Sequence, residues 1–213
     1  MTNAKVQRKD VYSPEELVSM NKNLELFSIG YFRLRSGAIH SISYKTGKRR
    51  CEVARLLIED LSLNDAGDLN IRFTVAKKRK KEESLILTQR TKTIPNGDSY
   101  GEMVKQYFDF MKKNHPNCKY LFPSGKAIFS NYIFDYSKPI SGRQLLRIIK
   151  TLNVRGWQHL YRETVGAKII DKNPTLDGVF AVSNRLDIEF NTAVHYFQRH
   201  VKQRLEKEEI EKE

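Results

Sequence analysis

Five residue types occur in a fixed order along this chain, and that order constrains its fold and chemistry more than any composition figure does. In chain order they are Arg49, a lysine within residues 77–81, His159, Arg162 and Tyr196. The local sequences are TGKRRCE at residues 46–52 and HLYR at residues 159–162, and the tyrosine lies near the C-terminus. The set combines cations, an imidazole and a phenol, which can hold an anion, carry a proton and act as a nucleophile.

The length of 213 residues suits one domain that needs no disulfide or metal in order to fold. We expect a flexible N-terminal segment at residues 1–12, one domain at residues 13–199 and a charged tail at residues 200–213. The two cysteines, Cys51 and Cys118, are not clustered, and the sequence has neither a secretory signal nor a long apolar run. We therefore expect a cytoplasmic location, in association with the nucleoid, or in the cytoplasm of a host if a virus or plasmid carries the gene.

The formal net charge of +13 favours a polyanionic partner and predicts that binding weakens steeply with salt. Nucleic acid, as double-stranded DNA, is the leading candidate. An anionic membrane surface would also fit the charge, but no basic amphipathic helix with exposed aromatic residues stands out, and the last residues are acidic. We expect no membrane association.

Helix and turn signals divide the chain mainly into helices, with a short β-hairpin. Residues 13–16 (SPEE) supply a helix N-cap, a proline in the first turn and a capping-box glutamate, and Asp98 and Ser141 are caps of two later helices. The basic run at residues 77–81 connects the first two strands. The sequence predicts helices at residues 14–23, 27–44, 49–57, 98–114, 141–152, 157–171, 175–184 and 191–208, and strands at 69–75, 84–88 and 120–124.

Breaking a phosphodiester bond without a metal requires a nucleophile, cations on the non-bridging oxygens and a proton donor for the departing 5′ oxygen. The five residue types described above include a side chain for each of these three roles. The sequence has no His-Glu-x-x-His motif, no paired Cys-x-x-Cys and no carboxylate cluster of the nuclease type. In order and spacing the motifs resemble the catalytic domain of the tyrosine recombinases, the phage integrase family.

The resemblance spans about residues 13–200 and implies an α+β, mainly helical fold with a small antiparallel β-sheet. It implies a site-specific recombinase or integrase that cleaves and rejoins DNA through a 3′-phosphotyrosine intermediate. It also implies that the reaction needs no metal and no cofactor, and that the protein acts on DNA as a homo-oligomer, a tetramer.

Arg49 and Glu52 lie at the start of a predicted helix, where the guanidinium can bind two phosphate oxygens and the carboxylate can orient it. By resemblance Arg49 is the family's first arginine, and the alternative is a solvated basic turn. His159 and Arg162 are three residues apart on one helical face, so both can reach one phosphate, the histidine as hydrogen-bond donor or proton acceptor. The alternative for His159 is a satisfied structural histidine.

Tyr196 is the nucleophile that the resemblance implies, because its separation from Arg162 is close to the one that the family shows. The phenol must lose its proton to react, and His159 is the expected base. The alternative is a core aromatic residue beside Phe190 and Phe197 on an amphipathic C-terminal helix.

The lysine of the set is expected, by resemblance, on the turn between the first two strands, where it would protonate the leaving 5′ oxygen. Counting back from residues 85–87 favours Lys78, with Lys77 as the runner-up. The other lysines of this run, including Lys80 and Lys81, are expected to bind the DNA backbone. A solvated turn and a nuclear-import signal are the alternatives.

One position departs from the family's pattern. The family usually places a second histidine or a tryptophan where this chain has Asp187, nine residues before Tyr196. An ionised aspartate cannot donate a hydrogen bond to a phosphate, so either Arg185 substitutes for the donor or the site is weakened. A DNA-binding protein with weakened or lost catalysis is therefore the alternative function, and a type IB topoisomerase is a third reading.

The helix predicted at residues 141–152 carries a basic stripe opposite an apolar face. Arg143, Arg147 and Lys150 form this stripe, and by resemblance the helix enters a major groove of DNA. Arg143 and Gln144 are candidates for contacts with base edges, whereas Arg147 and Lys150 more plausibly hold phosphates. The alternative is a solvated helix face.

The C-terminal helix has an apolar face of its own, formed by Phe197, Val201 and Leu205 at four-residue spacing. By resemblance this face would pack on a neighbouring protomer. Packing within its own domain is equally compatible with the sequence.

Overall fold

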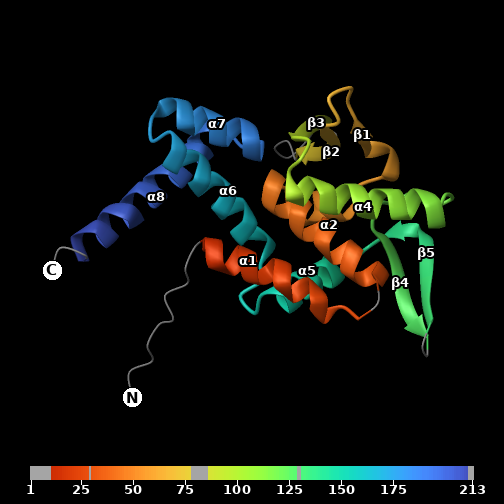
Figure 1. Cartoon of the computed structure of the whole chain (residues 1–213). Coiled ribbons are helices and arrows are strands. Elements are labelled where there is room, and N and C mark those ends of the chain that lie inside the picture. The colour runs from red at the N-terminus through yellow and green to blue at the C-terminus, as the bar shows by residue number, and fades with distance from the viewer. Residues whose placement is uncertain (1–10, 29, 78–85, 129–130, 211–213) are drawn as a thin grey trace, which may run out of the picture.

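The computed structural model describes residues 11–28, 30–77, 86–128 and 131–210. Its helices are α1 (Pro14–Lys22), α2 (Gly30–Thr46), α3 (Arg50–Ala54), α4 (Ser99–Asn114), α5 (Gly142–Leu152), α6 (Gln158–Lys172), α7 (Leu176–Leu186) and α8 (Phe190–Ile210). Its strands are β1 (Leu61–Leu63), β2 (Leu69–Lys77), β3 (Ile86–Ile94), β4 (Pro123–Ile128) and β5 (Asn131–Pro139). The predicted fold class is confirmed, because the chain is mainly helical with a small antiparallel sheet (Figure 1).

The three helix caps predicted from the sequence are confirmed. Ser13 forms a capping box with Glu16, and Ser141 forms one with Gln144. The Asp98 side chain accepts hydrogen bonds from two backbone amides of the first turn of α4. Such side chains satisfy amide groups that a helix leaves without partners at its start, which fixes where each helix begins.

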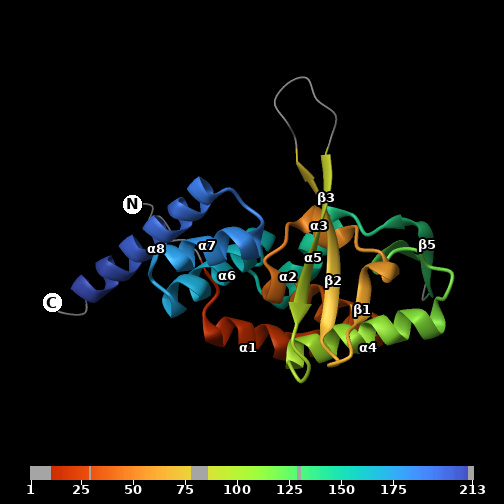
Figure 2. The same cartoon turned by 90° about the horizontal axis from the view of Figure 1, so that it is seen from above.

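Strands β1, β2 and β3 form an antiparallel sheet in that order, and one end of the β2–β3 pair extends beyond the helices (Figure 2). Strand β3 is longer than predicted, because it pairs with β2 as far as Ile94. Its polar stretch at residues 88–93 lacks apolar alternation, although threonines favour a strand. The connection at residues 78–85 contains Lys78, Lys80 and Lys81 and lies outside the described residues, and Lys77 is the last residue of β2.

A second hairpin, β4–β5, was not among the predicted elements. The strand predicted at residues 120–124 is wrong: Tyr120 makes one isolated bridge with Leu57, and β4 begins at Pro123. The missed signal is the alternation of aromatic residues along β5, of which Phe134 packs edge-on against Tyr31 of α2 with ring centroids 4.8 Å apart. Figure 1 shows this hairpin projecting from the body of the molecule.

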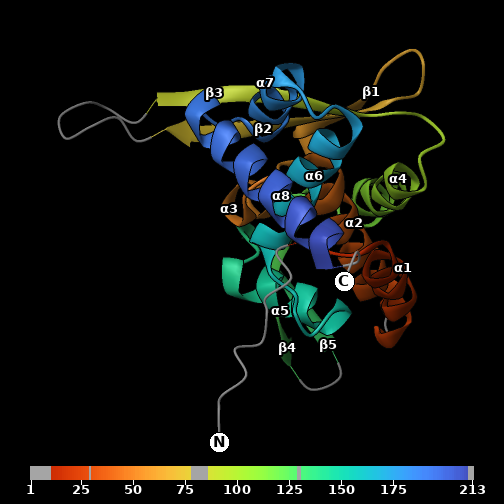
Figure 3. The ribbon, with the colours of Figure 1, turned by 90° about the vertical axis from the view of Figure 1, so that its left-hand side faces the viewer.

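Two clusters of buried apolar side chains form the interior. The large core lies among α2, α4, α5 and the three-stranded sheet and includes Ile39, Phe73 and Tyr107. The small core lies among α6, α7 and α8 and includes Val182 and Tyr196. Figure 3 shows α8 lying across α6 beside α7 on one side of the molecule, and α6 also packs against α2.

Residues near both ends of the predicted domain are ordered beyond the expected boundaries, and the boundaries themselves stay a prediction. Tyr12, within the segment expected to be flexible, is buried, and its backbone amide donates to Thr164 Oγ1 at 2.8 Å. Its ring centroid lies 4.9 Å from that of Tyr161, and this isolated aromatic contact leaves no periodic signal in the sequence. At the other end α8 continues past the boundary predicted at residue 200 to Ile210. No helix within the described ranges is both long and apolar enough to cross a membrane.

Candidate functional site

The turn after α2 is the segment on which the candidate site is built. Helix α2 ends at Thr46, and Gly47 takes a φ of 62°, a left-handed conformation that glycine adopts without steric cost. A Cβ at this position would lie 2.5 Å from Leu186 Cδ2, so close packing also requires glycine. The turn directs Lys48 to the end of α7 and leaves Arg49 at the start of α3.

Arg49 presents a half-exposed guanidinium that is held along one edge. Its backbone amide donates to Glu52 Oε2 at 2.8 Å, and its Nη1 donates to Glu52 Oε1 at 3.2 Å. The Arg49 side chain is 49% exposed, whereas that of Glu52 is 6% exposed. The contact predicted between these two residues is confirmed, and it leaves further N–H groups of Arg49 able to bind an anion.

Arg162 is the buried arginine of the site, with only 4% of its surface exposed. Its Nη1 donates to the backbone oxygen of Gly47 at 2.8 Å, and its Nη2 donates to that of Leu186 at 2.5 Å. These two carbonyls come from segments that are far apart in the sequence. Arg162 therefore joins the α2–α3 turn to the end of α7.

Charged and polar side chains from three other positions influence the pKa of this guanidinium. Burial lowers the pKa of Arg162 from its ordinary value, and the neighbouring Arg49 lowers it further, whereas Tyr196 and Glu52 raise it. The Tyr196 phenol and the Arg162 guanidinium lie close enough for each to shift the pKa of the other. The structure thus brings together Arg49, Glu52, Arg162 and Tyr196, four of the residues singled out in the sequence.

Tyr196 is both a core residue and a neighbour of charged groups. It is 9% exposed, and burial raises the pKa of its phenol above the ordinary value. The Glu163 carboxylate raises this pKa further, whereas Arg162 and Arg199 lower it. A Cβ on Gly166 would lie 3.1 Å from Tyr196 Cδ1, so the glycine makes room for the ring. The phenol of this structure therefore holds its proton at neutral pH.

His159 lies at the surface, one helical turn before Glu163. Its side chain is 56% exposed, and its Nε2 lies 2.8 Å from Glu163 Oε1, an ion-pair distance that lacks hydrogen-bond alignment. Glu163 Oε2 accepts a hydrogen bond from Arg199 Nη2 at 2.5 Å. Glu163 therefore links His159 to the helix that carries Tyr196, while a direct role of His159 as the base for Tyr196 stays a prediction.

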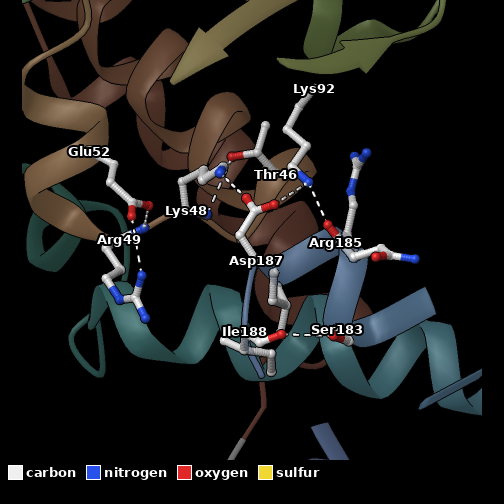
Figure 4. Close-up of polar contacts among 12 residues, drawn as sticks. Thr46, Lys48, Arg49, Glu52, Lys92, Ser183, Arg185, Asp187 and Ile188 are labelled. Atoms are coloured by element: carbon white, nitrogen blue, oxygen red, sulfur yellow. Dashed lines mark hydrogen bonds and ion pairs between the residues drawn. The ribbon is translucent and has the colours of Figure 1, made fainter. Parts of the chain in front are cut away.

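Asp187 lies at the end of α7 and is paired with two lysines. Its φ of 50° makes it the one non-glycine residue with a positive φ among the described residues. Its carboxylate pairs with the ammonium groups of Lys48 and Lys92, the latter at 3.2 Å, and Lys92 also donates to the backbone oxygen of Asn184 at 2.6 Å (Figure 4). Burial alone would raise the pKa of Asp187, but the two lysines hold it below its ordinary value. Asp187 is therefore an ionised acceptor whose partners lie within the chain.

Arg185 points away from Arg49. Its Nη2 donates to the backbone oxygen of Lys45 near the end of α2. Figure 4 shows its guanidinium on the other side of Asp187 from Arg49. This arrangement gives no support to the idea that Arg185 replaces the family's second histidine.

A cavity of about 380 Å³ opens beside Arg49. Glu52 and Val75 of β2 contribute to its wall, as do Asp187 and Thr192, which lies one helical turn before Tyr196. A second cavity of about 420 Å³ lies along β3 and α7 and shares Val75 and Asp187 with the first. Among the described residues, no group of three or more histidine, cysteine, aspartate or glutamate side chains is arranged to hold a metal ion.

Helix α5 exposes the predicted basic stripe and buries the opposite apolar face. The exposed residues of the stripe are Arg143, Arg147 and Lys150. Gln144 is placed differently: its Oε1 accepts from the Ser141 backbone, and its Nε2 donates to the backbone oxygen of Gly125 at 3.2 Å. Its carboxamide is thus bound within the chain, which argues against its predicted contact with a base edge.

Several residues around the site were not predicted. Glu163 lies four residues after His159 and Arg199 three residues after Tyr196, so helical spacing could have found both. The pairing of Asp187 with Lys48 and Lys92 joins three separate segments, and no local pattern in a single sequence signals it.

The comparisons with known proteins bear on the fold. No protein-family model and no curated protein matches this sequence. The solved structure of the XerH site-specific recombinase bound to a palindromic difH substrate, a post-cleavage complex, is similar with a TM-score of 0.64 and 17% sequence identity, covering 92% of this chain and 51% of that one. A pre-cleavage complex of XerH with difH is similar with a TM-score of 0.60 and 17% identity, covering 88% and 49%. The chain has the fold of these recombinases and spans about half of their length.

Proposed function

We propose that this protein is a site-specific recombinase that cleaves and rejoins double-stranded DNA through a 3′-phosphotyrosine on Tyr196. The observation that carries the proposal is the buried Arg162 guanidinium, which lies close enough to the Tyr196 phenol and to Arg49 for both to shift its pKa. A phosphate held by the two arginines would lie beside the tyrosine oxygen. The fold shared with XerH, whose structures are complexes with a DNA substrate before and after cleavage, supports the same function.

In the proposed reaction, Tyr196 Oη attacks phosphorus in line, and a bond between them forms as the bond from phosphorus to O5′ breaks. Arg49 and Arg162 stabilise the charge on the non-bridging oxygens. His159 accepts the phenolic proton, and a lysine of residues 77–81, with Lys78 as the first choice, protonates the leaving 5′ oxygen. A 5′ hydroxyl of a partner strand then reverses these steps, so bond energy is retained without a nucleotide cofactor.

The DNA is expected to lie against the exposed basic stripe of α5 and the lysines of the β2–β3 connection. A tetramer on DNA is part of the proposal, as is a cytoplasmic location. Phe197 and Val201 pack against the small core of their own chain. A contact of these two residues with a neighbouring protomer is therefore not part of the proposal, and the side chain of Leu205 lies outside the described residues.

A covalent-adduct assay tests the proposal. The protein is mixed with nicked suicide duplexes without divalent metal, and SDS-resistant adducts are counted for the wild type and for Tyr196→Phe. The adduct should form with the wild type and be absent with Tyr196→Phe, because phenylalanine has no nucleophilic oxygen. The matched control is Tyr136→Phe, which removes the hydroxyl of an exposed tyrosine on the β4–β5 hairpin and should leave the adduct unchanged.

A DNA-binding protein without catalysis is the second candidate, because Tyr196 is buried beside Glu163 and Asp187 occupies a donor position. Equal binding of DNA by the wild type and Tyr196→Phe, with no adduct from either on cognate DNA, would establish it. A type IB topoisomerase would form the adduct and relax supercoiled plasmid, but it would not exchange strands between two duplexes.

A further inference from the structure

An ion-pair cluster of Lys48, Asp187 and Lys92 adjoins the two arginines of the site and has no role in the reaction proposed above. The Lys48 side chain is fully buried, and its ammonium lies 4.9 Å from the centroid of the Phe73 ring. Burying two charges costs solvation energy, so a buried ion pair is weak evidence for a gain in stability. The role of the cluster is better explained by the backbone segments that it holds in place.

The cluster is adjacent along the chain to both carbonyls that bind Arg162. Gly47, whose oxygen accepts from Arg162 Nη1, immediately precedes Lys48. Leu186, whose oxygen accepts from Nη2, immediately precedes Asp187. The Lys48–Asp187 ion pair therefore fastens together the two residues next to the acceptors (Figure 4).

This fastening matters because a planar guanidinium can bind two carbonyls only when they keep a particular separation and direction. The carbonyls belong to the α2–α3 turn and to the end of α7. Lys92 on β3 adds a third anchor, because its ammonium bonds both Asp187 and the backbone oxygen of Asn184 in α7. The left-handed backbone of Asp187 ends α7 directly after the Leu186 carbonyl.

We propose that Asp187, held between Lys48 and Lys92, is a positioning residue that sets the Gly47 and Leu186 carbonyls and thereby aims Arg162 at the scissile phosphate. This inference rests on the proposed function. It assigns a use to the position at which related enzymes are expected to carry a hydrogen-bond donor. The rival account treats Asp187 only as a lost donor whose negative charge opposes phosphate binding, and it predicts that removing the charge speeds cleavage.

The test compares single-turnover cleavage and DNA affinity for Asp187→Asn, Asp187→His and Lys48→Met. Asparagine and histidine both tolerate a left-handed backbone, so the first two variants keep the turn. Each variant should slow cleavage by about 10- to 100-fold, the scale expected when a reacting group is misplaced by about 1 Å, with DNA affinity little changed. The control is Asp177→Asn, an exposed carboxylate in the first turn of α7, which should leave the rate unchanged.

A second variant background separates positioning from loss of stability. In Arg162→Lys the fork that binds both carbonyls is gone, so adding Asp187→Asn should change the remaining cleavage rate by less than about two-fold. If Asp187→Asn slows cleavage in the Arg162→Lys background by as large a factor as it does in the wild type, the proposal is overturned. Faster cleavage by Asp187→Asn or Asp187→His in the wild-type background would also overturn it.

A readout that needs no catalysis keeps the inference apart from the proposed function. In ¹⁵N-labelled protein, two carbonyl bonds should slow rotation of the Arg162 guanidinium and give resolved Nη signals, which Asp187→Asn and Lys48→Met should merge. Unchanged Nη signals in both variants would overturn the inference even if the wild type cleaves DNA. If the Nη signals are resolved in the wild type and merged in both variants, but the wild type forms no adduct, the positioning role is supported and the proposed function is rejected.

Discussion

The two cores of this molecule bury titratable groups in different surroundings. In the large core, His40 Nδ1 lies 2.6 Å from Tyr161 Oη, its Nε2 has no hydrogen-bond partner within the described part of the chain, and burial lowers the pKa of His40 to about 4. In the small core, Tyr196 is also buried, but a carboxylate raises the pKa of its phenol and two guanidinium groups lower it. Burial alone therefore does not mark the candidate site, whereas a buried group among opposing charges does.

The largest expected effect comes from comparing two buried arginines, one beside each core. Arg162→Met should lower the rate of adduct formation by about 10²- to 10³-fold, the scale for losing one donor to a developing charge. Arg35→Met should leave the rate of the folded protein unchanged, because Arg35 packs over the Phe32 ring at 4.9 Å and not beside Tyr196. The test is the single-turnover cleavage rate of each variant, measured well below the melting temperatures of both. Equal losses of rate in the two variants would contradict the different roles given to Arg162 and Arg35.

A pH titration of stability should single out the large core. His40 has a folded pKa of about 4 against an ordinary value of 6.5, so the unfolded state binds its proton first as the pH falls. The His40 contribution to the free energy of unfolding should be fully present above pH 6.5 and fall by about 3 kcal/mol between pH 6.5 and 4.

Urea unfolding of the wild type and His40→Leu across this pH range measures that contribution as a difference. Subtracting one free energy of unfolding from the other removes the contribution of the carboxylates, because these groups titrate in both proteins. A difference between the two proteins that does not depend on pH would show that His40 is not held neutral.

The smallest expected effect comes from a glycine that faces the large core. Gly37→Ala, inside α2, meets its nearest atom at an ordinary 3.5 Å and should raise the free energy of unfolding by about 0.5–1 kcal/mol without changing the rate. Cleavage rates and urea midpoints for the wild type and Gly37→Ala would test this, and a rate lost in Gly37→Ala would contradict it.

The sequence predicted the elements that local rules determine. Caps at Ser13, Asp98 and Ser141 satisfy helix ends through neighbouring residues, and the Arg49–Glu52 contact spans one helical turn, so both follow from spacing. The β4–β5 hairpin was missed although its aromatic alternation is local. Sheet partners and hairpin packing depend on α2, which the strand itself does not encode.

The sequence predicted which residues belong to the candidate site better than it predicted the contacts that hold them in place. Arg162 and Tyr196 could be named from order and spacing, but the two carbonyls that hold Arg162 belong to distant segments. The partners of Asp187 were likewise hidden, because an ion pair between residues so far apart in the sequence has no local period.

The identity of the residue that becomes linked to DNA tests the central claim most directly. Trypsin cleavage after Arg185 and Arg199 releases residues 186–199, which contain Tyr196 as their only tyrosine. After reaction with a nicked suicide duplex and nuclease digestion, mass spectrometry should find this peptide carrying a nucleotide through a phosphate on Tyr196. A nucleotide on any other residue, or an unmodified peptide from a protein that has cleaved its DNA, would contradict the account.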